Sequence, residues 1–162
     1  MSPAHPSPSA TRARRVLVAG VGNVLRGDDG FGPAVAAMLG RLPEGVTVIE
    51  TGIGGIALLQ ELMEGYDGLV LIDAVQRGAR PGTLFLITPE VRGAVHVPDV
   101  HLANPDRVLS MAKSMGVLPE RVMIVGCQPA EIDELTEELS PAVRRSLAPA
   151  AARIEEIVNA WL

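Results

Sequence analysis

The sequence predicts a single α/β domain in which a mostly parallel sheet is covered by helices on both faces. Short apolar runs alternate with segments of helical periodicity along most of the chain, which is the pattern of such a sheet. A length of 162 residues with a hydrophobic content of 48% is enough for one domain of this kind. One apolar run follows the previous one without an intervening helix, which predicts that the sheet is mixed.

The predicted strands are continuous apolar runs, because both faces of a covered parallel strand are buried. In chain order they are residues 16–19, 46–49, 69–72, 83–87 and 122–125. The fourth run is reached through the loop 77–82, which has no room for a crossover helix. We therefore expect the fourth strand to run antiparallel at an edge of the sheet.

The predicted helices are indicated by apolar stripes, caps and prolines at first-turn positions. They are residues 33–39, 56–63, 104–116 and the C-terminal segment from 140. Pro33 and Pro105 fit the first turns of their helices, and Asn104 fits the cap before Pro105. Pro149 lies inside the last segment, where a proline is expected to kink the helix.

The N-terminal residues 1–15 are rich in Pro, Ser and Ala, and we expect them to form a disordered extension to a single domain spanning 16–162. Two arginines at its end precede an apolar stretch, as in a twin-arginine export signal. Asn23 and Arg26 interrupt that stretch, however, and no small-residue cleavage site follows. The expected location is the cytoplasm.

Charge and aromatic content bear on the possible partners. The formal charge of the chain is −5, and beyond residue 15 the remaining 11 basic and 19 acidic residues give −8. Such a surface repels nucleic acid and anionic lipid. Four aromatic residues in all are too few for a base-stacking platform, and no apolar run is long enough to span a bilayer. We expect neither nucleic acid nor a membrane as partner.

Acidic residues follow two predicted strands at the edge where open α/β sheets bind ligands. Asp28 and Asp29 lie in the glycine-rich loop after the first strand, and Asp73 directly follows the third. One of the two adjacent aspartates is expected to cap the next helix, which leaves the other available for function. Asp73 is equally compatible with a turn cap and with a functional role.

Two histidines, His96 and His101, precede the helix predicted after Asn104. A loop histidine is more often a surface residue than a ligand. Together with Asp29 and Asp73, however, a histidine would form an oxygen and nitrogen site for a divalent transition metal. With open coordination positions, such a set would suit a labile or shared ion better than a structural one.

Other chemistries find weaker support in the sequence. The first loop does not match the dinucleotide pattern G-x-G-x-x-G/A, because its sixth position is Leu25, and two aspartates there would repel a pyrophosphate. The single cysteine, Cys127, follows a buried strand without a nearby histidine, which favours packing over catalysis. The motifs H-E-x-x-H and G-x-S-x-G are absent.

Six sequence blocks follow one another from residue 16 onward. They are VLVAGVGNVLRGDDGFGPAV (16–35), LVLIDAV (69–75), PGTLFLI (81–87), HLANPDRVLSMAKSMG (101–116), IVGCQPAEID (124–133) and LSPAVRRSL (139–147). In these motifs and in their order, the chain resembles the nickel–iron hydrogenase maturation endopeptidases. The resemblance implies a three-layer α/β/α fold of the phosphorylase/hydrolase-like type. Its mixed five-stranded sheet would have the order 2-1-3-5-4, with the fourth strand antiparallel.

The resemblance also implies an activity: removal of the C-terminal extension of a nickel–iron hydrogenase large-subunit precursor after nickel insertion. The family's catalytic and metal-contacting positions fall on Asp29, Asp73 and His101, with Asp29 standing where some members carry Glu. Asp28 is then expected to form the loop or to cap the helix. The nickel comes with the precursor, so the free enzyme is not expected to hold it tightly.

Two alternatives to an endopeptidase remain open from the sequence. One is a non-catalytic nickel-sensing or chaperone module for hydrogenase assembly, which would use the same three side chains. The other is a nucleotide-binding α/β enzyme, which the first loop disfavours. If the endopeptidase interpretation holds, the attacking water is activated either by the metal or by one of the acids.

Overall fold

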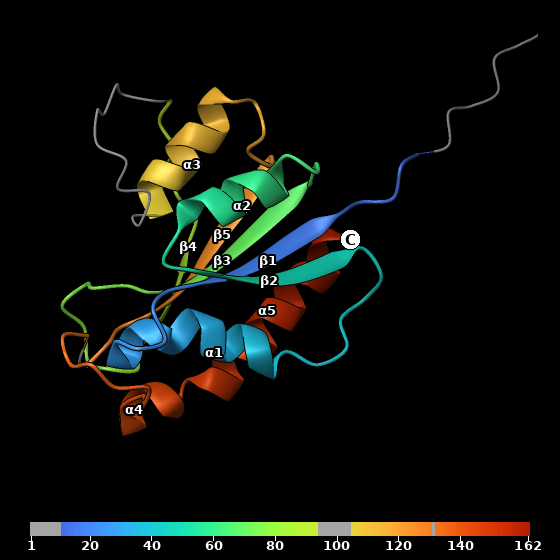
Figure 1. The fold of residues 1–162 in the computed structure, drawn as a ribbon. Coiled ribbons are helices and arrows are strands. Elements are labelled where there is room, and N and C mark those ends of the chain that lie inside the picture. Colours follow the sequence, from blue (N-terminus) through green and yellow to red (C-terminus); the bar gives the residue numbers. More distant parts are fainter. Residues whose placement is uncertain (1–10, 94–104, 131) are drawn as a thin grey trace, which may run out of the picture.

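The computed structural model describes residues 11–93, 105–130 and 132–162 (Figure 1). These residues form a sheet whose strands are β1 (Val16–Val21), β2 (Val46–Gly52), β3 (Gly68–Ala74), β4 (Leu84–Ile87) and β5 (Arg121–Cys127). The strand order is β2-β1-β3-β5-β4, and β4 pairs with β5 antiparallel while the other pairs are parallel. The predicted mixed sheet with the order 2-1-3-5-4 is confirmed.

Helices cover both faces of the sheet, which completes the predicted three layers (Figure 1). They are α1 (Phe31–Met38), α2 (Gly55–Leu62), α3 (Pro105–Ser114), α4 (Pro141–Arg144) and α5 (Leu147–Trp161), with a short 3-10 helix η1 (Gly27–Gly30) before α1. Helices α2 and α3 pack on one face, and α1 and α5 pack on the other.

The core consists of two apolar clusters, one on each face of the sheet. Along β1, Val16 and Val18 contribute to the cluster under α1 and α5, whereas Leu17 and Ala19 contribute to the cluster under α2 and α3. Since successive side chains of a strand point to opposite faces, a strand buried on both faces must be apolar at every position. This explains the continuous apolar runs that predicted the strands.

Four of the five strands extend further than the apolar runs that predicted them, whereas β4 begins one residue later than predicted. β2 continues to Gly52, and β3 continues to Ala74, so that Asp73 lies within the strand and pairs with Gly126 of β5. Hydrogen bonding to a neighbouring strand does not require an apolar side chain, and for that reason an apolar run underestimates the length of a strand.

The C-terminal helical segment breaks earlier than the sequence predicts. The expected kink at Pro149 is wrong: the break lies between α4 and α5, and Pro149 lies in the first turn of α5, where a missing N–H breaks no helical hydrogen bond. The hydroxyl of Ser146, just before α5, donates to the carbonyl of Gly82. The break between α4 and α5 therefore coincides with a hydrogen bond to the loop that precedes β4. The predicted cap Asn104 lies outside the described residues.

The described residues before β1 bind to the body of the domain. Arg12 forms an ion pair with Asp67 at 2.8 Å, and the backbone N–H of Arg15 donates to the same carboxylate at 2.7 Å. The division of the chain at residue 15 stays a prediction. In the described part of the chain, no helix combines the length and the apolar character that crossing a membrane requires.

Candidate functional site

The structure brings Asp29 and Asp73 together at the carboxyl edge of the sheet. Asp29 lies in η1, shortly after β1, and Asp73 lies near the end of the adjacent strand β3. Both line one cavity of about 210 Å³, together with Asn23, Thr51 and Pro105. Of the three predicted site residues, these two converge as the strand order requires.

The position of Asp29 is fixed by its own loop. The backbone N–H of Asn23 donates to Oδ2 of Asp29 at 2.9 Å, and Oδ1 of Asn23 accepts from the N–H of Leu25 at 2.9 Å. Gly22 has a φ of 137°, and a Cβ there would lie 1.9 Å from the carbonyl oxygen of Asp29. Only glycine fits such a conformation and such a contact. The Gly-Asn pair of the first motif therefore folds the loop back onto the aspartate.

The close approach of α1 to the sheet holds the two aspartates near each other. A Cβ at Gly32 would lie 2.2 Å from the carbonyl oxygen of Ile72 and 2.3 Å from that of Val21. Gly32 follows Asp29 by three residues, and Ile72 directly precedes Asp73. The lack of a side chain at residue 32 thus allows the segments that carry the two carboxylates to pack together.

The ionisation of Asp73 is perturbed by this arrangement. Burial, with the negative charge of Asp29 as a second cause, raises the pKa of Asp73 from 3.8 to about 7. A carboxyl group with this pKa is present in both protonation states near neutral pH. Its ionised form can accept a proton from a nearby water or offer an oxygen ligand to a cation.

Asp28 has a different role from its neighbour. Its buried carboxylate accepts hydrogen bonds from the backbone N–H of Ala130 at 2.7 Å, and from the N–H and hydroxyl of Ser140 at 2.7 and 2.8 Å. The predicted helix cap by one of the two aspartates is wrong, because Gly30 occupies the N-cap position of α1. Of the two roles expected for it, Asp28 has that of the loop-forming residue, and it ties η1 to Ala130 and Ser140.

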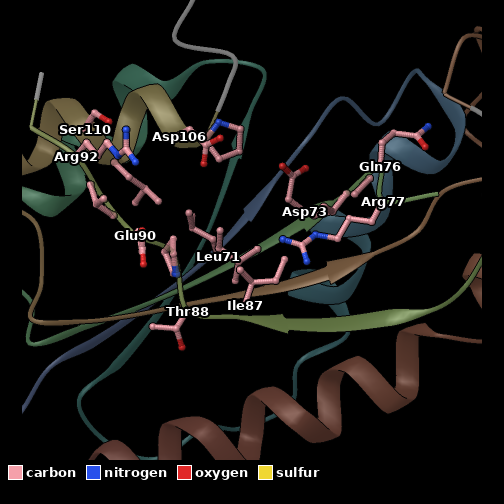
Figure 2. Close-up of a pocket in the computed structure, with 17 residues that line it drawn as sticks. Leu71, Asp73, Gln76, Arg77, Ile87, Thr88, Glu90, Arg92, Asp106 and Ser110 are labelled. Atoms are coloured by element: carbon pink, nitrogen blue, oxygen red, sulfur yellow. The ribbon is translucent and has the colours of Figure 1, made fainter. Parts of the chain in front are cut away.

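A second, larger cavity of about 820 Å³ adjoins Asp73 (Figure 2). It shares Asp73, Ala74 and Pro105 with the smaller cavity. Figure 2 shows Asp73 and Arg77 at one end of it and Arg92 at the other, so charges of both signs line it. Its volume is in the range of sites that bind small ligands or short peptide segments.

The loop beside this cavity is fixed by Gln128, for which the sequence predicts no role beyond its place at a strand end. Oε1 of the buried Gln128 accepts from the backbone N–H groups of Arg77 at 2.8 Å and Ala79 at 3.2 Å, and Nε2 donates to Gln76 at 2.9 Å. The guanidinium of Arg77 lies over the ring of Phe85, 5.6 Å from its centroid. The only signal in the sequence was a polar residue directly after a buried strand.

Cys127 is buried in the core on the α1 and α5 face of the sheet. Burial raises the pKa of its thiol from 9.0 to about 11, so the thiolate that acts as a nucleophile is scarce at neutral pH. Its environment agrees with the interpretation of Cys127 as a packing residue.

His101, the third predicted site residue, lies outside the described residues, as does His96. Among the residues that are described, no group of three or more His, Cys, Asp or Glu side chains is placed to hold a metal ion. The described part of the site is therefore a pair of carboxylates in a cavity, one of them with a raised pKa.

Comparisons with known proteins show the family to which the chain belongs. The sequence model of a family described as "Hydrogenase maturation protease" matches residues 34–157. The hydrogenase expression/formation protein HupD of Bradyrhizobium diazoefficiens is 31% identical over 161 residues, covering 95% of this chain and 83% of that protein. The corresponding protein HupM of Azotobacter chroococcum is 35% identical over 144 residues, covering 85% and 68%.

Solved structures show the same fold. The hydrogenase maturating endopeptidase HybD from E. coli superimposes with a TM-score of 0.76 at 29% identity, covering 90% of this chain and 92% of that one. A hydrogenase 2 maturation peptidase from a Thaumarchaeota archaeon gives a TM-score of 0.68 at 35% identity, covering 90% and 98%. This chain therefore belongs to the hydrogenase maturation protease family and is, like these structural neighbours, an endopeptidase.

Proposed function

We propose that this endopeptidase removes the C-terminal extension of a nickel–iron hydrogenase large-subunit precursor that already carries its nickel. The observation that carries the proposal is the convergence of Asp29 and Asp73 in one cavity of a hydrogenase maturation protease. Two carboxylates form a hard oxygen pair that suits a divalent cation. A precursor with nickel near its cleavage site would present such a cation.

The proposed contacts to nickel come from three side chains. Asp29 and Asp73 would each supply a carboxylate oxygen, and His101 would supply an imidazole nitrogen, all of which are acceptable nickel ligands. In the sequence, His101 lies four residues before Pro105, and Pro105 lines both cavities. The remaining coordination positions would be filled by the precursor's own ligands. The nickel is thus part of the substrate, and the free protein would hold it only loosely.

Contact with nickel would fix the nearby peptide bond in the site, and positioning of this kind lowers the barrier to reaction by several kcal/mol. Hydrolysis then needs an activated water beside the scissile carbonyl. The proton of that water can be taken by one of the two carboxylates or lost through polarisation by nickel. In either case, a precursor without nickel would be a poor substrate.

The test is an incubation of the purified protein with nickel-loaded and with metal-free precursor, followed by intact-mass spectrometry. The loaded precursor should lose its C-terminal extension, and the metal-free precursor should stay at full length. Equal shortening of both forms would contradict nickel recognition. Binding of the loaded precursor without any shortening would instead favour a nickel-sensing or chaperone role. When a site carboxylate such as Asp29 is replaced in the same assay, Glu50→Gln is the matched control. Glu50 is an exposed carboxylate on β2 that does not line the cavity, so this variant should process the loaded precursor normally.

A further inference from the structure

Exposed apolar side chains gather around the cavity that holds Asp29 and Asp73. We call these side chains the apolar rim: Val24 (49% exposed), Leu25 (52%), Ile53 (65%) and Leu135 (87%). Val24 and Leu25 lie between Asn23 and Arg26, which line the cavity, and Ile53 itself lines it. A single exposed apolar residue is ordinary, but several in one place mark an interaction surface.

The apolar rim is assembled from three separate parts of the chain that hydrogen bonds hold together. The N–H of Thr136 donates to the carbonyl of Leu25 at 2.9 Å, and the N–H of Gly27 donates to the carbonyl of Thr136 at 2.8 Å. The N–H of Gly22 donates to the carbonyl of Gly52 at 3.2 Å, which joins the loop of Val24 to that of Ile53. The loop after β1 and the segment before α4 accordingly lie side by side in Figure 1.

The segment that carries Leu135 is also anchored at two further points. The buried carboxylate of Asp28 accepts from Ala130 and from Ser140, which lie on either side of Leu135 in the sequence. Leu135 is therefore both the most exposed member of the apolar rim and part of a segment fixed by a buried charge. A segment whose backbone is already fixed loses less conformational entropy on binding than a free loop does, which favours its use in a protein interface.

We propose that the apolar rim is a docking surface for the folded body of the hydrogenase precursor, beside the point where its C-terminal extension enters the cavity. The proposal rests on the proposed function. The chain to be cut must reach Asp29 and Asp73, and the protein to which it is attached then covers the surface around the cavity. An apolar patch on the precursor would bury these four side chains, whereas a second copy of this chain has no reason to lie over the site.

The test compares the full chain with the double variant Leu25→Ser/Leu135→Ser, using nickel-loaded precursor. We expect the KM for the precursor to rise about tenfold or more, and kcat to stay within about twofold, because the two leucines act in binding and not in the chemical step. The dissociation constant of the complex, measured separately by biolayer interferometry, should rise by a similar factor. Met63→Ser is the matched control, because Met63 is 60% exposed at the far end of α2, near the opposite edge of the sheet, and should change neither constant.

Three outcomes would overturn the proposal: an unchanged KM and dissociation constant, a fall in kcat with an unchanged KM, or a dimer of this chain in sedimentation that the double variant dissociates. Leu135→Ser alone serves if the double variant fails to fold, since the side chain of Leu135 is almost fully exposed. If the wild-type protein binds the precursor without cutting it, the binding measurement still tests the apolar rim. In that case a weaker complex for the double variant supports docking, while the proposed function fails.

Discussion

Carboxylates at the two edges of the sheet lie in opposite electrostatic environments. At the amino edge, Asp67 is paired with Arg12 and accepts from the N–H of Arg15, so its charge is compensated by the segment entering β1. At the carboxyl edge, no basic side chain of the described residues forms an ion pair with Asp29 or Asp73. Burial of Asp73, with the negative charge of Asp29 as a second cause, raises the pKa of Asp73 and disfavours its ionisation. A compensated carboxylate stabilises the fold, whereas two uncompensated carboxylates in a cavity form a site that favours a cation.

The largest change in activity is expected when a negative charge is removed at the carboxyl edge of the sheet. Asp29→Asn should lower the rate of processing by about a hundredfold or more, because the amide keeps the shape but loses the negative charge. The initial rate with nickel-loaded precursor and the circular dichroism spectrum measure activity and fold together. A folded Asp29→Asn protein that processes precursor at the normal rate would contradict the assignment.

The histidine assignment is tested by a pair of variants. His101→Ala should lose most of the processing activity, since the imidazole is proposed to contact the substrate's nickel, while His96→Ala should retain most of it. The comparison of the two initial rates is internally controlled, because both residues lie in the same stretch of the chain. A greater loss from His96→Ala would exchange the roles of the two histidines.

The pH dependence of stability sharpens the comparison between the two edges. Between the ordinary pKa of 3.8 and the raised pKa of about 7, native Asp73 binds more proton than unfolded Asp73, so its contribution to stability falls as the pH rises. Asp73→Asn should therefore be inactive yet more stable than wild type at pH 8, by on the order of 2 kcal/mol, with a smaller difference at pH 4.5. Urea unfolding at the two pH values measures this difference.

The matched variant at the amino edge is Asp67→Ala. It removes the acceptor of Arg12 and of the Arg15 N–H, so it should destabilise the protein by about 1 kcal/mol and leave processing unchanged. If both variants shifted stability in the same direction at pH 8, the contrast between the two edges would be wrong.

A larger loss of stability than that of Asp67→Ala is expected at the neighbour of Asp29. Asp28→Asn places an amide donor among the three donors that Asp28 accepts from, so it should cost about 2 kcal/mol of unfolding free energy. Urea denaturation compares this variant with Asp29→Asn, which should be nearly as stable as wild type. Equal stabilities for the two variants would refute the division of roles between the adjacent aspartates.

The smallest effect on activity is expected at Cys127. Because its thiol is buried and protonated at neutral pH, Cys127→Ala should process precursor within about twofold of the wild-type rate. The free energy of unfolding should instead fall by about 1 kcal/mol, because removal of the sulfur leaves a small void in the core. Loss of processing in a folded Cys127→Ala protein would restore a thiol mechanism.

The sequence predicted those parts of the fold and the site that depend on local pattern or on the edge of the sheet. The apolar runs located the strands, the helix-free loop 77–82 indicated the antiparallel fourth strand, and the strand ends placed Asp29 and Asp73 at one edge. What escaped prediction depends on distant contacts. The partners of Asp28 lie more than a hundred residues away, and Gln128 supports a loop about fifty residues earlier. No local pattern carries such information.

The packing at Gly32 limits how this family member can vary. Any side chain there would push α1 away from the ends of β1 and β3, because the space is filled by the carbonyl oxygens of Ile72 and Val21. A substitution that changed the packing of α1 on the sheet would therefore also change the distance between the two carboxylates. The apolar rim has no such constraint, since Leu135 points away from the core. Adaptation to a new precursor would thus be expected to change the rim first and to leave the chemistry of the site untouched.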